Sequence, residues 1–256
     1  MSIFLSGLLW VFGAVVVGAV VGYLVRRFGL DEGRPGNNDA AGQVFTIVGG
    51  LNAVVIAFVL VSLYDGVSAA QDGSYKEANS LVAATWAADS LPEPTRAQAR
   101  EISRAYATTV AEQEWPQLRS GEQVAGPGWQ HLDQLRDVVE QAQLSDDAQG
   151  WMADQKKEAM TQLAELYQAR QARLTEANDP GIGTVVWCVL VLGSVITVLL
   201  PNLFGGTKMV THVIIVSTLA GTLALLLFGI YQLQNPYTGG AKVEPDAFKW
   251  ALERLR

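Results

Sequence analysis

The stretch IGTVVWCVLVLGSVITVLLPNLFG, residues 182–205, is followed after a short link by MVTHVIIVSTLAGTLALLLFGIYQLQ, residues 209–234. A second pair of apolar runs, residues 3–25 and 44–64, lies near the N-terminus. None of the four runs contains Asp, Glu, Lys or Arg. A helix rises about 1.5 Å per residue, so about 20 apolar residues cross the roughly 30 Å hydrocarbon core of a bilayer. The sequence therefore predicts two transmembrane hairpins.

The first apolar run is interpreted as a membrane helix that stays in the protein. It lacks the basic residues that precede the apolar part of a signal peptide, and it is longer than the usual 7–15 residues. Within it, Ala14, Gly18 and Gly22 recur at four-residue spacing. Small residues at this spacing let another helix backbone approach closely, so these three are helix-packing candidates.

The segment between the two hairpins is polar and helical. The second membrane helix is predicted to extend into this segment until Leu91–Pro92–Glu93–Pro94 ends it. Thr95 is the predicted N-cap of the next helix, with Gln98 at the capping-box position, and Trp115–Pro116 marks its predicted end. Ser145 opens the last aqueous helix, whose predicted apolar face comprises Trp151, Met152, Ala159, Leu163, Leu166, Tyr167 and Leu174.

These patterns predict an all-α integral membrane protein, with four transmembrane helices in two hairpins and an inserted aqueous helical bundle. Residues 1–65 form the first hairpin, residues 66–180 the bundle, residues 181–235 the second hairpin and residues 236–256 a C-terminal tail. About 115 residues are enough for the bundle to have a core of its own. We expect a multi-pass protein of the cell membrane.

The composition argues against several classes of function. Charged residues make up 17% of the chain, and the formal net charge is −7. A nucleic-acid-binding protein usually shows a basic patch with interleaved aromatic residues, which is not seen here. His131, His212 and the single Cys188 offer little material for a metal site or a Ser–His–Asp arrangement. We therefore expect no catalytic residue, no metal, no cofactor and no enzymatic activity.

Asn52 is the strongest hydrogen-bonding residue inside the second apolar run. An amide in hydrocarbon needs a partner or a wet cavity, so two interpretations stay open: a hydrogen bond between helices, or the lining of a pore. Ile56, Val59 and Leu63 lie on the same helical face. A ring of such residues from several subunits is a hydrophobic constriction that gates by dewetting, and the four are pore-lining candidates. Apolar contact with lipid or other helices is the alternative.

Pairs of acidic residues in the aqueous segment are interpreted as solvated helix faces, in particular Asp146–Asp147 and Glu112 with Glu114. The acidic segment as a whole allows two interpretations. In the first, the negative charge concentrates cations near a pore mouth. In the second, it only keeps the domain soluble.

The run from Gly49 to Trp115 resembles a bacterial family of bestrophin-like membrane proteins of unknown function. The resemblance rests on Glu77–Ala78 before Leu81, then Leu91–Pro92, Tyr106 and Glu114–Trp115–Pro116. The C-terminal pattern Asn235–Pro236–Tyr237–Thr238–Gly239, followed by Val243, Pro245 and Phe248, is also similar to that family. The family often has Phe-Arg or Phe-Ser in place of Tyr237–Thr238.

The resemblance implies four membrane helices, a helical aqueous domain and a homo-oligomer. True bestrophins are pentameric anion channels whose second membrane helix lines an apolar neck, so a pentamer is the expectation by analogy. The acidic aqueous domain fits an anion pathway poorly and favours cations or weak selectivity. Orientation stays open. Basic residues in the hairpin loops favour an extracytoplasmic bundle, whereas the bestrophin analogy and the basic C-terminus favour a cytoplasmic one.

The leading functional hypothesis is an oligomeric, channel-like membrane protein that conducts ions passively through a pore lined by the second transmembrane helix. The alternative is a non-conducting membrane scaffold or regulatory protein whose helical domain binds a partner. The expected partners are the lipid bilayer, further copies of the chain and ions.

Overall fold

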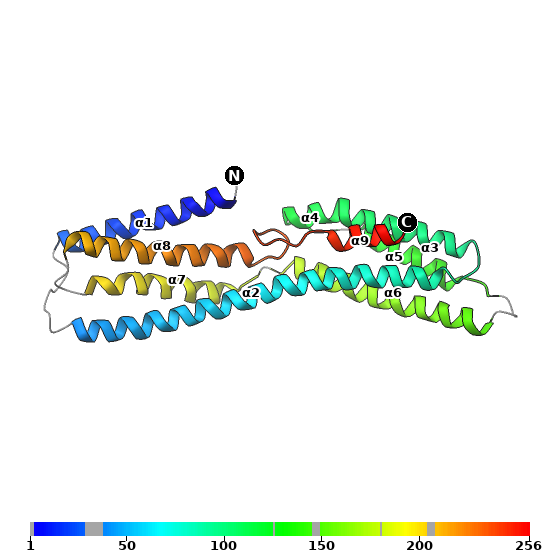
Figure 1. Cartoon of the computed structure of the whole chain (residues 1–256), viewed down its shortest axis with the longest axis horizontal. Helices are drawn as coiled ribbons and strands as arrows, with labels where there is room; N and C mark the ends of the chain where they lie inside the picture. The colour runs from blue at the N-terminus through cyan, green and yellow to red at the C-terminus, as the bar shows by residue number, and fades with distance from the viewer. Residues whose placement is uncertain (1–2, 29–37, 125, 145–148, 180, 204–207) are drawn as a thin grey trace. The chain divides into compact units, whose positions relative to one another are not determined.

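The computed structural model describes residues 3–28, 38–124, 126–144, 149–179, 181–203 and 208–256. Regular structure in these ranges is entirely helical (Figure 1). The chain divides into two compact units. The first comprises residues 1–65 and 180–234, and the second comprises residues 66–179 and 235–256. The predicted C-terminal tail, residues 236–256, thus belongs to the second unit.

Four helices are long and apolar enough to cross a membrane: α1 (Ile3–Arg27), α2 (Asn38–Ala88), α7 (Thr184–Leu199) with the 3₁₀ turn Leu200–Leu203, and α8 (Met209–Leu233). The predicted all-α membrane fold with four spans is confirmed. Helix α2 has 51 residues, so it continues well beyond its apolar run. It also begins six residues earlier than the predicted start at residue 44, with Asp39 in its first turn, where a carboxylate is favourable.

In the first unit, α1 runs alongside α8 (Figure 1). A small apolar core joins α2 to the second hairpin, and its buried members are Ile56, Leu190, Leu223 and Ile230. Large apolar side chains point outward along all four spans, among them Phe12, Leu192 and Ile214. Exposing such a surface to water is unfavourable. A small core with an apolar exterior is instead typical of helices in lipid.

The second unit holds the rest of α2 together with α3 (Thr95–Thr109), the π-helix Val110–Glu114, α4 (Trp115–Ser120), α5 (Pro127–Glu140), α6 (Gln149–Ala177) and α9 (Asp246–Arg254). Its core is much larger than that of the first unit. The C-terminal segment is part of this core, because Tyr237 and Phe248 are fully buried against Trp115. The indole nitrogen of Trp115 also donates to the carbonyl of Val243 at 3.0 Å.

Two predicted helix ends in this unit are wrong. Thr95 is the first helical residue rather than the N-cap, and the carboxylate of Glu93 accepts the backbone N–H of Ala97 instead (3.2 Å). Trp115–Pro116 does not end a helix. The π-helix widens the turn just before Pro116, and proline, which lacks an N–H, is tolerated in the first turn that follows. Helix α4 ends at Ser120, and the next residue, Gly121, adopts a left-handed conformation.

The apolar face predicted for α6 is largely correct. Ala159, Leu163, Leu166 and Leu174 are buried, but Trp151 is 62% exposed because it lies near the start of the helix, beyond the core. The predicted opening at Ser145 and the acidic pair Asp146–Asp147 lie outside the described residues.

Candidate functional site

The predicted pore-lining residues of α2 have packing partners within the chain. Asn52 is 7% exposed and Ile56 is 2% exposed. The side chain of Asn52 lies in the notch that Gly193 leaves on α7, where an added Cβ would collide with the amide oxygen. Val59 and Leu63 are half-buried at the edge of the core formed with the second hairpin. Their pore-lining role stays a prediction, and in the single chain these four residues join α2 to its neighbours.

The opposite face of α2 has no partner among the described residues. With 3.6 residues per turn, Leu51, Val54, Phe58 and Val61 fall on this face, and each is more than half exposed. Asp65 continues the same row and is also exposed. The row therefore changes from apolar to acidic along a single helix. Below, "open face" means these five residues.

The helix-packing candidates of α1 lie toward α8. Gly18 and Gly22 are buried, and Ala14 is half-buried. A Cβ at Gly18 would stand 2.9 Å from Cβ of Ala220 and 3.2 Å from the backbone of α8, so only glycine permits the observed approach. Gly22 is less critical, because its nearest neighbours would be at 3.6 Å.

A cluster of four charged residues lies buried in the second unit. Glu77 comes from α2, Glu114 from the π-helix, and Arg170 and Arg173 from α6; none is more than 2% exposed. Arg173 binds Glu77 through two bonds, Nε to Oε2 at 2.7 Å and Nη2 to Oε1 at 3.0 Å. Arg170 binds Glu114 in the same two-pronged way, at 2.9 and 2.6 Å. We call this set, together with Tyr106, the ion-pair cluster.

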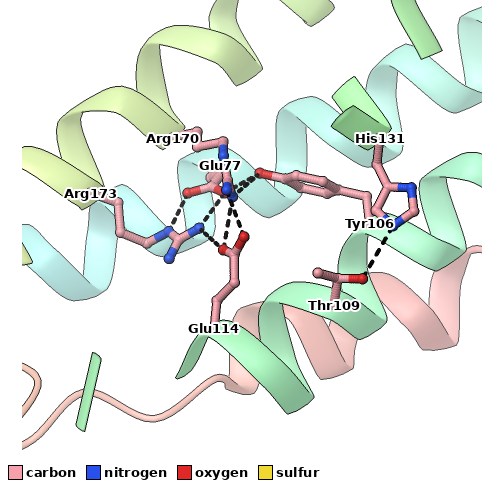
Figure 2. A network of polar contacts seen from close by, with 7 residues as sticks. All are labelled: Glu77, Tyr106, Thr109, Glu114, His131, Arg170 and Arg173. Atoms are coloured by element: carbon pink, nitrogen blue, oxygen red, sulfur yellow. Dashed lines mark hydrogen bonds and ion pairs between the residues drawn. The ribbon is translucent and has the colours of Figure 1, made fainter. Parts of the chain in front are cut away.

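The two ion pairs are linked to each other. Nη2 of Arg173 also reaches Oε2 of Glu114 at 3.2 Å, and the hydroxyl of Tyr106 donates to Oε1 of Glu77. Figure 2 shows both arginines pointing from α6 toward the carboxylates, while the phenol of Tyr106 reaches the same place from α3. The cluster therefore joins four separate elements around one electrically neutral centre.

Aromatic rings enclose the cluster. The Arg170 guanidinium lies 4.8 Å from the ring centre of Trp129, and that of Arg173 lies 5.5 Å from the ring centre of Trp115. Phe248 also faces Arg173, at 5.6 Å. A guanidinium over an aromatic face gains electrostatic attraction without exposure to water. These rings exclude water, so each charge is stabilised mainly by the opposite charges of the cluster.

Local backbone features bring the charges together. The π-helix places Glu114 at the end of a widened turn, one residue before Trp115. At the start of α5, Gly128 allows the backbone to lie directly against the Arg170–Glu114 pair, where an added Cβ would collide with both side chains. Arg170 and Arg173 are three residues apart on α6, so they share one face of that helix.

The surroundings shift the pKa values of the cluster. Burial opposes the charged form of Glu114, but the two arginines outweigh this effect and lower its pKa below 4.5. Burial, together with the negative charge of Glu77, raises the pKa of the Tyr106 hydroxyl well above 10, so the phenol stays neutral. The two arginines thus favour the charged form of Glu114, and burial favours the neutral form of Tyr106.

The prediction of a solvated face at Glu114 is wrong, because this side chain is buried. Glu112 does lie toward solvent, but the widened π-turn directs Glu114 inward to Arg170 and Arg173. The two buried arginines were not predicted from the sequence. The signal was present, because Leu163, Leu166, Arg170 and Arg173 continue one apolar stripe at three- and four-residue spacing.

The two histidines belong to different units. His131 contacts the hydroxyl of Thr109 at 3.3 Å beside the cluster (Figure 2), and His212 contacts Asn202 at 3.0 Å in the first unit. In the ranges that the structure describes, no group of three or more His, Cys, Asp or Glu residues is arranged to hold a metal ion.

The fold and its burial pattern define a helical membrane protein with four spans and a folded domain inserted between the hairpins. A bestrophin-like domain model matches residues 12–248. The chain therefore belongs to the bestrophin-like family, as the sequence resemblance suggested. No curated protein matches at a significant level.

Solved structures agree with this assignment. A variant of a bacterial bestrophin homologue from Klebsiella pneumoniae superimposes with a TM-score of 0.70 at 13% identity, covering 100% of this chain and 98% of that one. Another structure of the homologue, solved by zinc phasing, gives a TM-score of 0.65 at 13% identity, covering 97% and 96%. At such low identity the likeness shows the shared fold.

Proposed function

We propose that the protein assembles in the cell membrane as a homo-oligomeric channel that conducts ions passively through a pore lined by α2. The observation that carries this proposal is the open face of α2. It is a row of exposed side chains that has no partner within the described chain, on a helix that extends from the membrane-spanning unit into the aqueous one. Membership in the bestrophin-like family adds the expectation that copies assemble, and a pentamer remains the expectation by analogy.

Copies of α2 arranged about an axis would present a narrow apolar band to the ion path. Leu51, Val54, Phe58 and Val61 supply this band. Gly50, Ala53 and Ala57 are exposed beside it and are small enough for neighbouring helices to approach closely. A band of this kind gates by dewetting, because water and ions enter it only when it widens.

The residue that follows the band sets the expected selectivity. Asp65 is the first charged residue after the apolar part of α2 and is exposed on the same face. One carboxylate from each copy would form a negative ring, which attracts cations. Asp65→Asn should therefore move the reversal potential under a salt gradient toward the value expected for anions.

The proposal is tested in lipid bilayers with a Cys188→Ala parent protein. Cysteines at Val54 and Val61 should react with a charged, water-soluble thiol reagent, and the current should fall. Two matched controls should not respond: Ile56→Cys, which faces the core on the same helix, and Val189→Cys, which is exposed on α7. If the reagent reduced the current only in Ile56→Cys, the face of α2 that carries Asn52 would line the pore instead.

A sealed bilayer containing folded, oligomeric protein would contradict the channel proposal. The alternative, a non-conducting scaffold whose helical domain binds a partner, would then take its place.

A further inference from the structure

We propose that the ion-pair cluster locks the axial register of α2 against α6 and thereby controls the opening of the pore. This inference rests on the proposed function for its consequence, but the register itself is a property of the second unit. Helix α2 contributes Glu77 and α6 contributes Arg173, and the pair is fully buried.

The geometry of the pair makes it sensitive to sliding. A guanidinium and a carboxylate that meet through two parallel bonds, here at 2.7 and 3.0 Å, need a fixed relative position. A displacement of α2 by the rise of a single residue is about 1.5 Å along the helix axis, which is about half the length of these bonds and distorts the paired geometry. Nearby core residues of α2 such as Ala78 and Leu81 are apolar and tolerate small shifts more readily.

The surroundings make a displaced state costly. Arg173 shares Glu114 with Arg170, so moving Glu77 away leaves an excess of positive charge inside an aromatic shell. A buried charge without its partner is strongly disfavoured, whereas the same displacement at a surface pair costs little. Replacing such clusters with apolar residues is often neutral for stability, so the specific contribution of this cluster is positional.

The lock bears on the proposed pore because α2 is one helix from Asn38 to Ala88. Phe58 of the open face and Glu77 of the cluster lie on this same helix. Because the helix is continuous, we expect an axial shift at Glu77 to be transmitted along it toward Phe58. Weakening the two-pronged contact between Arg173 and Glu77 should therefore change how often the pore opens. The conductance of each open pore should stay the same, because the lining side chains set it.

The register can be measured without any current. Lys76 on α2 and Glu165 on α6 form an exposed ion pair at 3.3 Å between the same two helices. Spin labels on Lys76→Cys and Glu165→Cys, in the Cys188→Ala background, should give one narrow distance distribution. Arg173→Lys keeps the positive charge but removes the two-pronged contact, and it should broaden or shift this distribution.

The matched control is Arg100→Lys. Arg100 also binds a carboxylate through two bonds, both 2.7 Å long, but its partner is Asp89 and α6 is not involved. This variant should leave the distance between the labels unchanged. If Arg173→Lys fails to fold in detergent, Arg170→Lys offers a second test, because Arg170 holds Glu114 and only indirectly Glu77.

In reconstituted bilayers, Arg173→Lys should change the ratio of open to closed time by about tenfold, the factor that corresponds to one charge-assisted hydrogen bond, with unitary conductance unchanged. An unchanged label distance in Arg173→Lys overturns the register lock, whatever the currents show. A broadened label distance with an unchanged open probability would show that the register lock does not control the pore. If the parent protein passes no current, the channel proposal fails, and the label distance still decides the register lock.

Discussion

Glu114 shows how a single buried residue makes stability depend on pH. Its two arginine partners hold its pKa below the value of 4.5 that it has when unfolded. A carboxyl group with a lowered folded pKa stabilises the fold fully above its unfolded pKa, and this contribution disappears as pH falls through the folded value. The cluster should therefore be intact at pH 7 and begin to weaken below about pH 4.5.

The pH prediction concerns the melting temperature in detergent. Between pH 6 and pH 3.5 the parent protein should lose melting temperature more steeply than Glu114→Gln, which has no proton to gain at this position. The variant should start from a lower value at pH 6, because its neutral amide leaves the arginines undercompensated. Parallel slopes for the two proteins would mean that Glu114 does not contribute to the acid sensitivity.

Gly128 makes a second prediction at the residue scale. An added Cβ would collide with Arg170 and Glu114, two buried side chains whose bonds fix them in place. Gly128→Ala should therefore lower the unfolding free energy by about 1–3 kcal/mol, as overpacking does in other cores. Gly73→Ala is the control, because nothing lies within 4 Å of its added Cβ in the middle of α2. The control should stabilise the helix by about 0.5–1 kcal/mol.

The buried charges also mark where sequence reasoning failed. Arginine in an amphipathic helix usually lies in solvent, so the sequence pattern did not single out Arg170 and Arg173, although they continue the apolar stripe of α6. Their burial depends on Glu77 and Glu114, which are 96 and 59 residues away from Arg173 in the sequence. A single sequence does not reveal which distant carboxylates meet which arginines.

At the scale of elements, sequence reasoning was reliable for the membrane helices. Runs without charge, such as residues 209–234, directly predict spans, because hydrocarbon excludes charge over a fixed thickness. The sequence was a poorer guide to the rotation of each helix about its own axis, that is, to which face packs inward. In α2 both faces are apolar, so periodicity alone did not reveal that Asn52 and Ile56 face α7 and α8 while Phe58 faces outward.

The contact between α1 and α8 gives a prediction at this scale. Gly18→Ala would place its Cβ within 3.2 Å of the α8 backbone, which does not yield as a flexible side chain does. The two helices must then separate, and we expect a loss of about 1–3 kcal/mol in unfolding free energy in detergent. Gly13→Ala lies on the same helix with open space around it and should not destabilise the protein. Equal behaviour of the two variants would remove the special role of Gly18.

For the whole molecule, the division into units constrains the membrane topology. Residues 66–179 and 235–256 form one compact unit although α7 and α8 separate them in the sequence. Two helices that each cross the bilayer return the chain to the side it left. We therefore expect the inserted domain and the C-terminus on the same side, and the two hairpin connections on the other. The basic residues of the hairpin loops and the C-terminus left this choice of sides open.

Single cysteines in the Cys188→Ala background test this topology with a membrane-impermeant maleimide on intact and opened cells. Thr161→Cys and Glu253→Cys, both exposed in the second unit, should label under the same condition. Lys208→Cys, exposed at the start of α8, should label under the opposite one. The condition that labels Thr161→Cys shows which side holds the helical domain. Different behaviour of Thr161→Cys and Glu253→Cys would mean that α7 and α8 do not both cross, because a single folded unit has one side.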